Sequence, residues 1–147
     1  MLIIIRGLPG SGKSTAAREK FGDRLILETD QFLTSGGRYQ YTQEDHESAV
    51  AMIADILVRC LRFGMDVVIV GCFSTRDSVL RHIATAERFR QPWRVYAVEG
   101  PRRYNNHMVP EEVYASMAER WEDFEGEYKV STKETVPYGQ ERRKSRP

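Results

Sequence analysis

The sequence has few of the residues that disulfide-stabilised or zinc-binding proteins need. Among 147 residues there are two cysteines, Cys60 and Cys72, and three histidines. Neither cysteine has a partner at a metal-binding spacing. We therefore expect two free, buried thiols, as is typical of a protein kept in a reducing compartment.

Long apolar runs and an excess of one charge are also missing. The apolar run at the start is only Leu2–Ile5, no stretch is long enough to cross a bilayer, and no signal-peptide pattern is present. The formal net charge is +1, with acidic and basic residues interspersed. The composition by itself therefore indicates neither a nucleic-acid-binding protein nor a membrane protein, and it predicts one domain in the cytoplasm.

A phosphate-binding loop follows the apolar run directly. The pattern G-x-x-x-x-G-K-[ST] is matched at every position from Gly7 to Ser14, and residues 15–20 then form a helical pattern. The residues expected to bind the nucleotide are Gly7, Leu8, Pro9, Gly10, Ser11, Gly12, Lys13, Ser14 and Thr15. Glycine allows a turn tight enough for successive N–H groups to converge on phosphate oxygens. Lys13 is placed to reach the outer phosphates, Ser14 to bind Mg²⁺, and the helix adds its positive end. The motif predicts a protein that binds ATP with Mg²⁺.

Short apolar runs then alternate with helical patterns, which is typical of a parallel α/β protein. We expect a phosphate-loop kinase fold of three layers, with a parallel sheet of about four strands between flanking helices. The strands are expected at 2–6, 25–29, 67–70 and 93–98. The helices are expected from the loop to about 21, from an N-cap at Thr42 to Gly64, from an N-cap at Thr75 to about 90, and from Pro110 to about 124.

The domain organisation follows from the same pattern. Residues 1–127 are expected to form the kinase domain, with a lid at about 99–110. From residue 128 the pattern fades, and 128–147 are expected to be an extension that is partly disordered and basic at its end.

Three classes of protein share such a loop: GTPases, motor-like ATPases and small kinases. The chain has no Asn-Lys-x-Asp element for reading guanine. The buried run that ends at Val70 leads into Gly71 and Cys72, where motor-like ATPases place an acidic residue. A small kinase fits best, because it needs a phosphate cradle, Mg²⁺, a carboxylate near the acceptor hydroxyl and cations over the phosphates.

Asp30 is the candidate catalytic carboxylate. It follows the second expected strand, and ligands of open parallel sheets bind beyond the carboxyl ends of the strands. As a general base it would orient and deprotonate the acceptor hydroxyl, and it would also hold a Mg²⁺-bound water. The alternative is an aspartate that only caps the following turn.

Basic and aromatic residues on other loops are candidates for contacts with nucleotide and acceptor. Arg102 and Arg103 are predicted to belong to a lid over ATP, since guanidinium groups match phosphate oxygens in two-point contacts; a solvated basic loop is the alternative. Arg38 and Tyr39 are candidates for binding a substrate phosphate or stacking on a base, and Phe73 for an acceptor contact. Ordinary loop or core packing is the alternative for these three.

With these residues the chain resembles the polynucleotide-kinase-like branch of phosphate-loop kinases, which includes phage 5′-OH polynucleotide kinase domains. The likeness covers about residues 1–125. Residues 6–15 resemble the family's opening, 29–32 its Asp-containing element, 37–41 a Gly-x-Tyr-x-aromatic stretch, and 105–110 its lid-to-helix junction. The resemblance implies an ATP-dependent kinase with Asp30 as general base.

Two departures from the family pattern lie on the acceptor side. An Asp-Thr-Asn-like element after the third strand is replaced by residues 71–75, and the lid arginine is replaced by Tyr104. Arg102 or Arg103 would have to take over the lid role. Both departures leave the identity of the acceptor open.

Three functions are compatible with these features. The leading one is ATP-dependent phosphorylation of a nucleic acid or nucleotide-like acceptor, at a polynucleotide 5′-OH of DNA or RNA or at the hydroxymethyl group of a modified base. The second is a kinase for a small metabolite or an antibiotic. The third is an ATP-binding module without catalysis, which Asp30→Asn would separate from both kinases.

Overall fold

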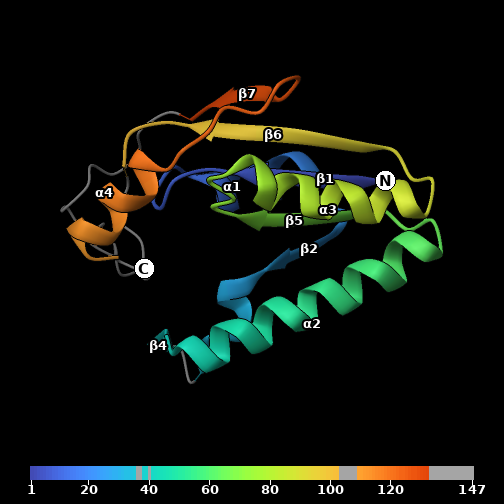
Figure 1. The fold of residues 1–147 in the computed structure, drawn as a ribbon, viewed down its shortest axis with the longest axis horizontal. Coiled ribbons are helices and arrows are strands. Elements are labelled where there is room, and N and C mark those ends of the chain that lie inside the picture. The colour runs from blue at the N-terminus through green and yellow to red at the C-terminus, as the bar shows by residue number, and fades with distance from the viewer. Residues whose placement is uncertain (36–37, 40, 103–108, 133–147) are drawn as a thin grey trace, which may run out of the picture.

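The centre of the protein is a parallel sheet of five strands (Figure 1). The computed structural model describes residues 1–35, 38–39, 41–102 and 109–132. The strand order is β2-β5-β1-β6-β7, and all four neighbouring pairs run parallel. The bounds are β1 Leu2–Arg6, β2 Leu25–Glu28, β5 Val67–Gly71, β6 Trp93–Glu99 and β7 Tyr128–Ser131. The predicted α/β class is confirmed.

The expected number of about four strands is too low by one. The additional strand, β7, pairs with β6 at the edge of the sheet, and only Val130 among its residues is even half-buried. An edge strand with one covered face lacks the unbroken apolar run that marked the central strands. Its short sequence was therefore not distinguishable from the extension expected from residue 128 onward.

Helices cover both faces of the sheet, as a three-layer architecture requires. On one face, Leu2 and Ile4 pack with α2 (Gln43–Arg62) and α3 (Arg76–Arg88); on the other, Ile3 and Ile5 pack with α1 (Lys13–Phe21). Successive residues of a strand point to opposite faces, so β1 must be apolar at every one of these positions. This explains why β1 reads as a continuous apolar run.

The two threonine N-caps are confirmed. The Thr42 hydroxyl accepts from Asp45 N at 3.1 Å, and the Thr75 hydroxyl accepts from Ser78 N at 3.2 Å. A side-chain oxygen at this position satisfies an N–H that has no partner within the helix. Gly64, with a φ of 71°, follows the end of α2.

Two stretches differ from the expected elements. The helix after Pro110, α4 (Glu111–Glu119), ends five residues before Phe124, because Glu122 N donates to Ser74 O at 2.8 Å and the chain turns to reach it. Between β2 and α2 lie a 3-10 helix, η1 (Thr29–Phe32), and a two-stranded antiparallel pair, β3 (Thr34–Ser35) and β4 (Arg38–Tyr39).

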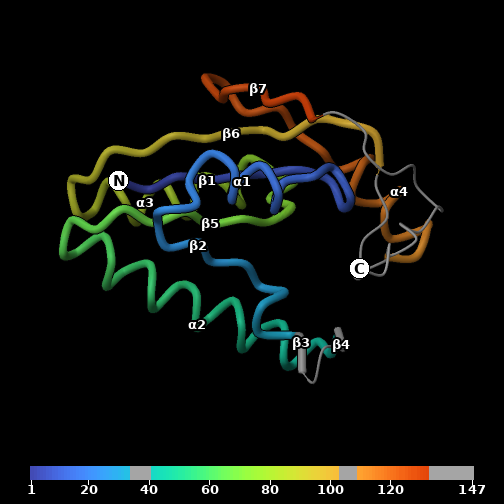
Figure 2. Tube along the Cα trace, turned by 180° about the vertical axis from the view of Figure 1, so that it is seen from behind, coloured from blue at the N-terminus to red at the C-terminus, as the bar shows by residue number. Residues whose placement is uncertain are grey.

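The phosphate loop, Asp30, Phe73 and Arg102 each follow a strand of this sheet. Because the strands are parallel, their carboxyl ends lie together, and α4 lies beyond this end while Met1 lies at the other (Figure 1). Figure 2 shows the same arrangement from behind. Among the described residues no helix is both long and apolar enough to span a bilayer.

Candidate functional site

The phosphate loop connects β1 to α1 and takes the shape that its glycines allow. Gly10 and Gly12 have φ angles of 78° and 92°, which disfavour residues with a Cβ. A Cβ on Gly7 would collide with the Ser11 side chain and approach Val98 O to 3.1 Å. Ser11 N donates to Leu8 O at 3.1 Å and closes the turn. The loop backbone therefore encloses a space that side chains at these glycine positions would occupy.

Ser11 gives a further indication of a ligand at this loop. Its hydroxyl is buried and has no hydrogen-bond partner among the described residues. A buried hydroxyl without a hydrogen-bond partner lowers the stability of the fold by about 1–3 kcal/mol, so such groups are rare unless a ligand or water binds them. Its carbonyl, in contrast, accepts a hydrogen bond of 2.7 Å from Thr132 Oγ1, just after β7. The loop is thus tied to the far edge of the sheet and retains one free polar group.

Lys13 marks the place where three loops meet. Burial lowers the pKa of its ammonium group, and the nearby Cys72, Asp30 and Glu28 oppose that shift. These neighbours follow or end β5 and β2, whereas Lys13 follows β1. The Lys13 Nζ donates to Leu8 O at 3.5 Å. The structure therefore brings Lys13 and Asp30 together, as the parallel topology required.

Asp30 lies in η1, which directly follows β2. It is half-buried, and its backbone carbonyl accepts from Leu33 N at 3.2 Å. The single turn of 3-10 helix carries the carboxylate past the end of the strand. Its effect on the pKa of Lys13 places it beside the phosphate loop.

Glu28 is a site residue that sequence reasoning missed. Ser14 Oγ donates to Glu28 Oε2 at 3.0 Å, so a carboxylate touches the hydroxyl assigned to Mg²⁺. Glu28 also caps η1: its side chain accepts from Gln31 N, and its own N–H donates to Gln31 Oε1 at 3.2 Å. The available signal was an acidic residue at the second-to-last position of the strand expected at 25–29.

The donor set at this point fits Mg²⁺. Among the described residues no group of three His, Cys, Asp or Glu side chains could hold a metal ion. Mg²⁺ does not need such a cage, because it keeps several waters and uses one or two carboxylates with phosphate oxygens. Ser14, Glu28 and the neighbouring Asp30 offer hydroxyl and carboxylate oxygens, which are the hard ligands that it prefers.

The predicted lid and acceptor residues are only partly described. The Arg102 guanidinium donates to Glu111 Oε1 at 2.7 Å and to Val109 O at 3.2 Å, and it lies 4.0 Å from the centre of the Tyr114 ring. Arg102 thus holds the start of α4. Arg103 lies outside the described residues.

Of Arg38 and Tyr39 the structure describes the backbone, as β4. Phe73 has a φ of 41°, unusual for a residue with a side chain. Its ring packs edge-on against His82, with 5.2 Å between ring centres, and a Cβ on Gly71 would lie 2.9 Å from it. The ring also packs against the core cluster that holds α2 and α3 to the sheet.

Arg6 holds the Phe73 loop and was not singled out from the sequence. It ends the apolar β1 and is fully buried. Its Nε donates to Phe73 O at 2.9 Å, and its Nη2 donates to Ser74 O at 3.2 Å and Glu122 O at 2.8 Å. Carbonyls that accept from a buried charged donor are held firmly. Arg6 therefore joins the loop after β5 to the segment after α4.

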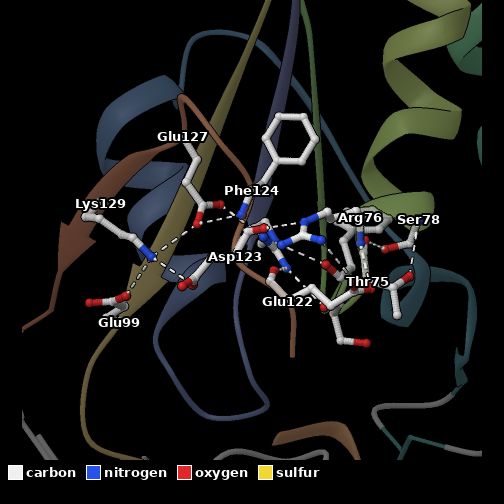
Figure 3. Close-up of polar contacts among 12 residues, drawn as sticks. Thr75, Arg76, Ser78, Glu99, Glu122, Asp123, Phe124, Glu127 and Lys129 are labelled. Carbon is white, nitrogen blue, oxygen red and sulfur yellow. Dashed lines mark hydrogen bonds and ion pairs between the residues drawn. The ribbon is translucent and has the colours of Figure 1, made fainter. Parts of the chain in front are cut away.

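A buried carboxylate and an indole ring complete the surroundings of Arg6. Its Nη1 lies 3.0 Å from Glu127 Oε2, and the side chain of Glu127 is 2% exposed. The ring of Trp121 covers the guanidinium, with 3.9 Å from Cζ to the ring centre. Glu127 also forms an ion pair with Lys129 (Figure 3), with 3.1 Å between Oε1 and Nζ. Trp121 thus packs on the guanidinium, whereas Trp93 is 36% exposed.

This fold and this loop define a phosphate-loop NTPase fold: a five-stranded parallel sheet with a phosphate-binding loop after its central strand. Residues 2–107, most of the chain, match the sequence profile of a family described as AAA domain. The chain therefore belongs to this AAA domain family.

Solved structures of low sequence identity share the fold. Kti12 from Chaetomium thermophilum, in complex with ADP-AlF3, is 17% identical over 89% of each chain, with a TM-score of 0.62. A gluconokinase from Sinorhizobium meliloti 1021 is 21% identical, with 88% of this chain and 79% of that chain covered and a TM-score of 0.55. A chain of the Pnkp1/Rnl/Hen1 RNA repair complex is also 21% identical, with 81% and 36% covered and a TM-score of 0.56. The similarity shows a shared fold and does not single out the polynucleotide-kinase-like branch.

Proposed function

We propose that the protein is an ATP-dependent kinase that transfers the γ-phosphate to an acceptor hydroxyl. The observation that carries this proposal is that Asp30, just past the end of β2, lies near enough to Lys13 of the phosphate loop to act on its pKa. A cation for the phosphates and a carboxylate for the acceptor are the two parts that a phosphoryl transfer needs side by side.

Each residue has a defined task in this reaction. The loop N–H groups and Lys13 hold the phosphates of ATP, and Ser14 with a neighbouring carboxylate holds Mg²⁺, which supplies charge neutralisation when bound. Asp30 accepts the proton of the acceptor hydroxyl. The hydroxyl oxygen of the acceptor then bonds to the γ-phosphorus, while the bond between that phosphorus and the β,γ-bridging oxygen breaks and ADP leaves. Asp30 is therefore the proposed general base.

The lid proposed for residues 99–110 contains two arginines, and the structure describes one of them, Arg102. Arg102 is engaged with Glu111, Val109 and Tyr114 at the start of α4. A contact with nucleotide would require Arg102 to leave these partners, so its proposed task is to position the lid. Arg103 is then the arginine proposed to reach the phosphates.

The proposed acceptor is a nucleic acid or a nucleotide-like molecule. Supporting it are the family resemblance in the sequence and the structural likeness to a chain of an RNA repair complex. The likeness to a gluconokinase, with nearly the same TM-score, favours a small-metabolite kinase as the second candidate. An ATP-binding module without catalysis is the third.

Transfer of label from γ-labelled ATP tests this proposal. The acceptors are 5′-OH DNA and RNA oligonucleotides, DNA with hydroxymethylated bases, nucleosides and gluconate, with Mg²⁺ present. We expect label on a nucleic acid or nucleoside, and a loss of orders of magnitude in turnover with Asp30→Asn while ATP still binds. Asp23→Asn, with an exposed side chain before β2, is the matched control and should leave transfer unchanged.

Other results would redirect the proposal. Label only on gluconate would move the protein to the small-metabolite class. ATP binding without any transfer would support the non-catalytic module. Full transfer by Asp30→Asn would contradict the assignment of the base.

A further inference from the structure

We propose that Glu28, at the end of β2, is the acidic residue of the Mg²⁺ site and forms its protein side together with Ser14. This inference rests on the proposed function, because it assumes that ATP binds at the loop. It separates two tasks that the sequence had combined in Asp30: Glu28 serves the cation and Asp30 serves the acceptor.

The first observation is that β5, the strand beside β1, does not end in an acidic residue. Phosphate-loop NTPases hold Mg²⁺ with the loop hydroxyl and an acidic residue from another strand. Here β5 is the direct neighbour of β1, and it ends in Val70 and Gly71 without an acid. The cation site would therefore lack a carboxylate unless another strand supplies one.

The second observation is that β2 supplies one at the same level of the sheet. Glu28 pairs with Val70 of β5, and Val70 pairs with Ile5 of β1. Glu28 is thus level with the end of β1 but one strand further out. Its longer side chain spans that distance, since Oε2 lies 3.0 Å from Ser14 Oγ.

The direction of this hydrogen bond suits a cation. Ser14 donates its proton to Glu28, so the lone pairs of the hydroxyl oxygen remain available to a metal ion. Hydrogen-bonded carboxylates beside metal ligands fix their orientation and typically change metal affinity about 10–100-fold when they are removed. The same carboxylate acts on the pKa of Lys13, which places negative charge beside the phosphate-binding cation.

A purely structural role for Glu28 can be separated from this one. Glu28 caps η1 by accepting from Gln31 N, and a glutamine at position 28 retains an oxygen that can accept the same bond. Glu28→Gln therefore removes the charge and keeps the cap. A capping role predicts no change in metal dependence, whereas a role in the cation site predicts a large one.

The test measures ATP affinity by calorimetry on the full chain, once with a chelator and once with Mg²⁺. In the unchanged protein we expect Mg²⁺ to raise the affinity. In Glu28→Gln we expect the metal-free affinity to stay within about twofold and the gain from Mg²⁺ to shrink about tenfold or more. Binding of Mn²⁺ with ATP, followed by electron paramagnetic resonance, should weaken in parallel.

Two comparison variants sharpen the result. Asp30→Asn should keep the gain from Mg²⁺ although it abolishes transfer. Glu19→Gln makes the same charge change at an exposed position of α1 and should behave like the unchanged protein. If Glu28→Gln does not fold, Glu28→Asp retains the charge on a shorter side chain and should also lose most of the gain.

The outcomes distinguish this inference from the proposed function. An undiminished gain from Mg²⁺ in Glu28→Gln would overturn the assignment of Glu28 and leave the kinase proposal standing. If only Asp30→Asn loses the gain in ATP affinity from Mg²⁺, then Asp30 and not Glu28 is the acidic residue of the cation site. No ATP binding by the unchanged protein, with or without Mg²⁺, would overturn both proposals.

Discussion

Replacement of Arg6 by methionine should destabilise the protein strongly, although Arg6 lies outside the phosphate-loop motif. Methionine is unbranched and fits the space of the arginine stem, so the change removes the charge and the donors with little loss of volume. The guanidinium is fully buried, donates to three backbone carbonyls and pairs with Glu127 at 3.0 Å.

The size of this destabilisation depends on the buried groups that lose their partner when Arg6 is replaced. Removing one partner of a buried ion pair costs about 3–5 kcal/mol, because the other charge stays buried without compensation. Here Lys129 remains 3.1 Å from Glu127 Oε1 and moderates that part of the loss. The carbonyls of Phe73, Ser74 and Glu122 lose a charged donor, and water that enters the site replaces part of these bonds. We expect a total loss of about 3–5 kcal/mol, a large share of the 5–15 kcal/mol typical of a domain.

Urea unfolding followed by tryptophan fluorescence measures this loss. Trp121 covers the Arg6 guanidinium and is a local reporter. With a slope of about 2 kcal/mol per M, the midpoint should fall by about 1.5–2.5 M. Arg59→Met is the matched control: it breaks an exposed pair with Asp55 and should cost less than about 1 kcal/mol.

A double-mutant cycle with Glu127→Gln tests the ion pair itself. Each single change removes the charge attraction, so the two losses should not add, and the coupling should exceed about 1 kcal/mol. A loss below about 1 kcal/mol for Arg6→Met, or strict additivity in the cycle, would refute the reasoning that this buried pair joins the Phe73 loop to the segment after α4.

Two further predictions concern the loop anchor and the response to pH. Thr132→Val removes the 2.7 Å bond to the Ser11 carbonyl and should weaken ATP binding about 2–10-fold in calorimetry, whereas Thr132→Ser should not; equal affinity of both would contradict an anchoring role. Burial, aided by the nearby Arg81, lowers the pKa of His82 below its ordinary 6.5. The unfolded chain therefore binds the proton more readily, so the urea midpoint should fall as the pH drops below about 6.5. His82→Leu should flatten that fall, and an unchanged slope in the variant would assign the effect to other groups.

Local sequence patterns were sufficient for much of the fold and for locating the phosphate loop of the candidate site. The unbroken apolar runs of β1 and β5 identified the central strands, because both faces of these strands are covered. Thr42 and Thr75 identified two helix starts through contacts only three residues long. The phosphate loop is a contiguous motif whose shape depends on its own glycines, so its residues were predictable.

The parts that were not predictable depend on residues far apart in the chain. Arg6 meets Glu127 across 121 positions, and Thr132 meets Ser11 across the same separation. The strand β7 is defined by its pairing with β6 and not by its own apolar pattern. No periodicity or short motif reports on such contacts, because they exist only once the sheet has formed.

The chain's own pattern therefore specified a phosphate-binding loop on a parallel α/β domain, since both are properties of short segments. Only the tertiary structure determines that Glu28, and not Asp30, accepts the hydrogen bond of Ser14. The register of β2 against β5 places Glu28 beside that hydroxyl and carries Asp30 onward into η1. In sequence the two acids are separated by one residue and are chemically alike. Their different surroundings arise from strand pairing, which is a property of the assembled sheet.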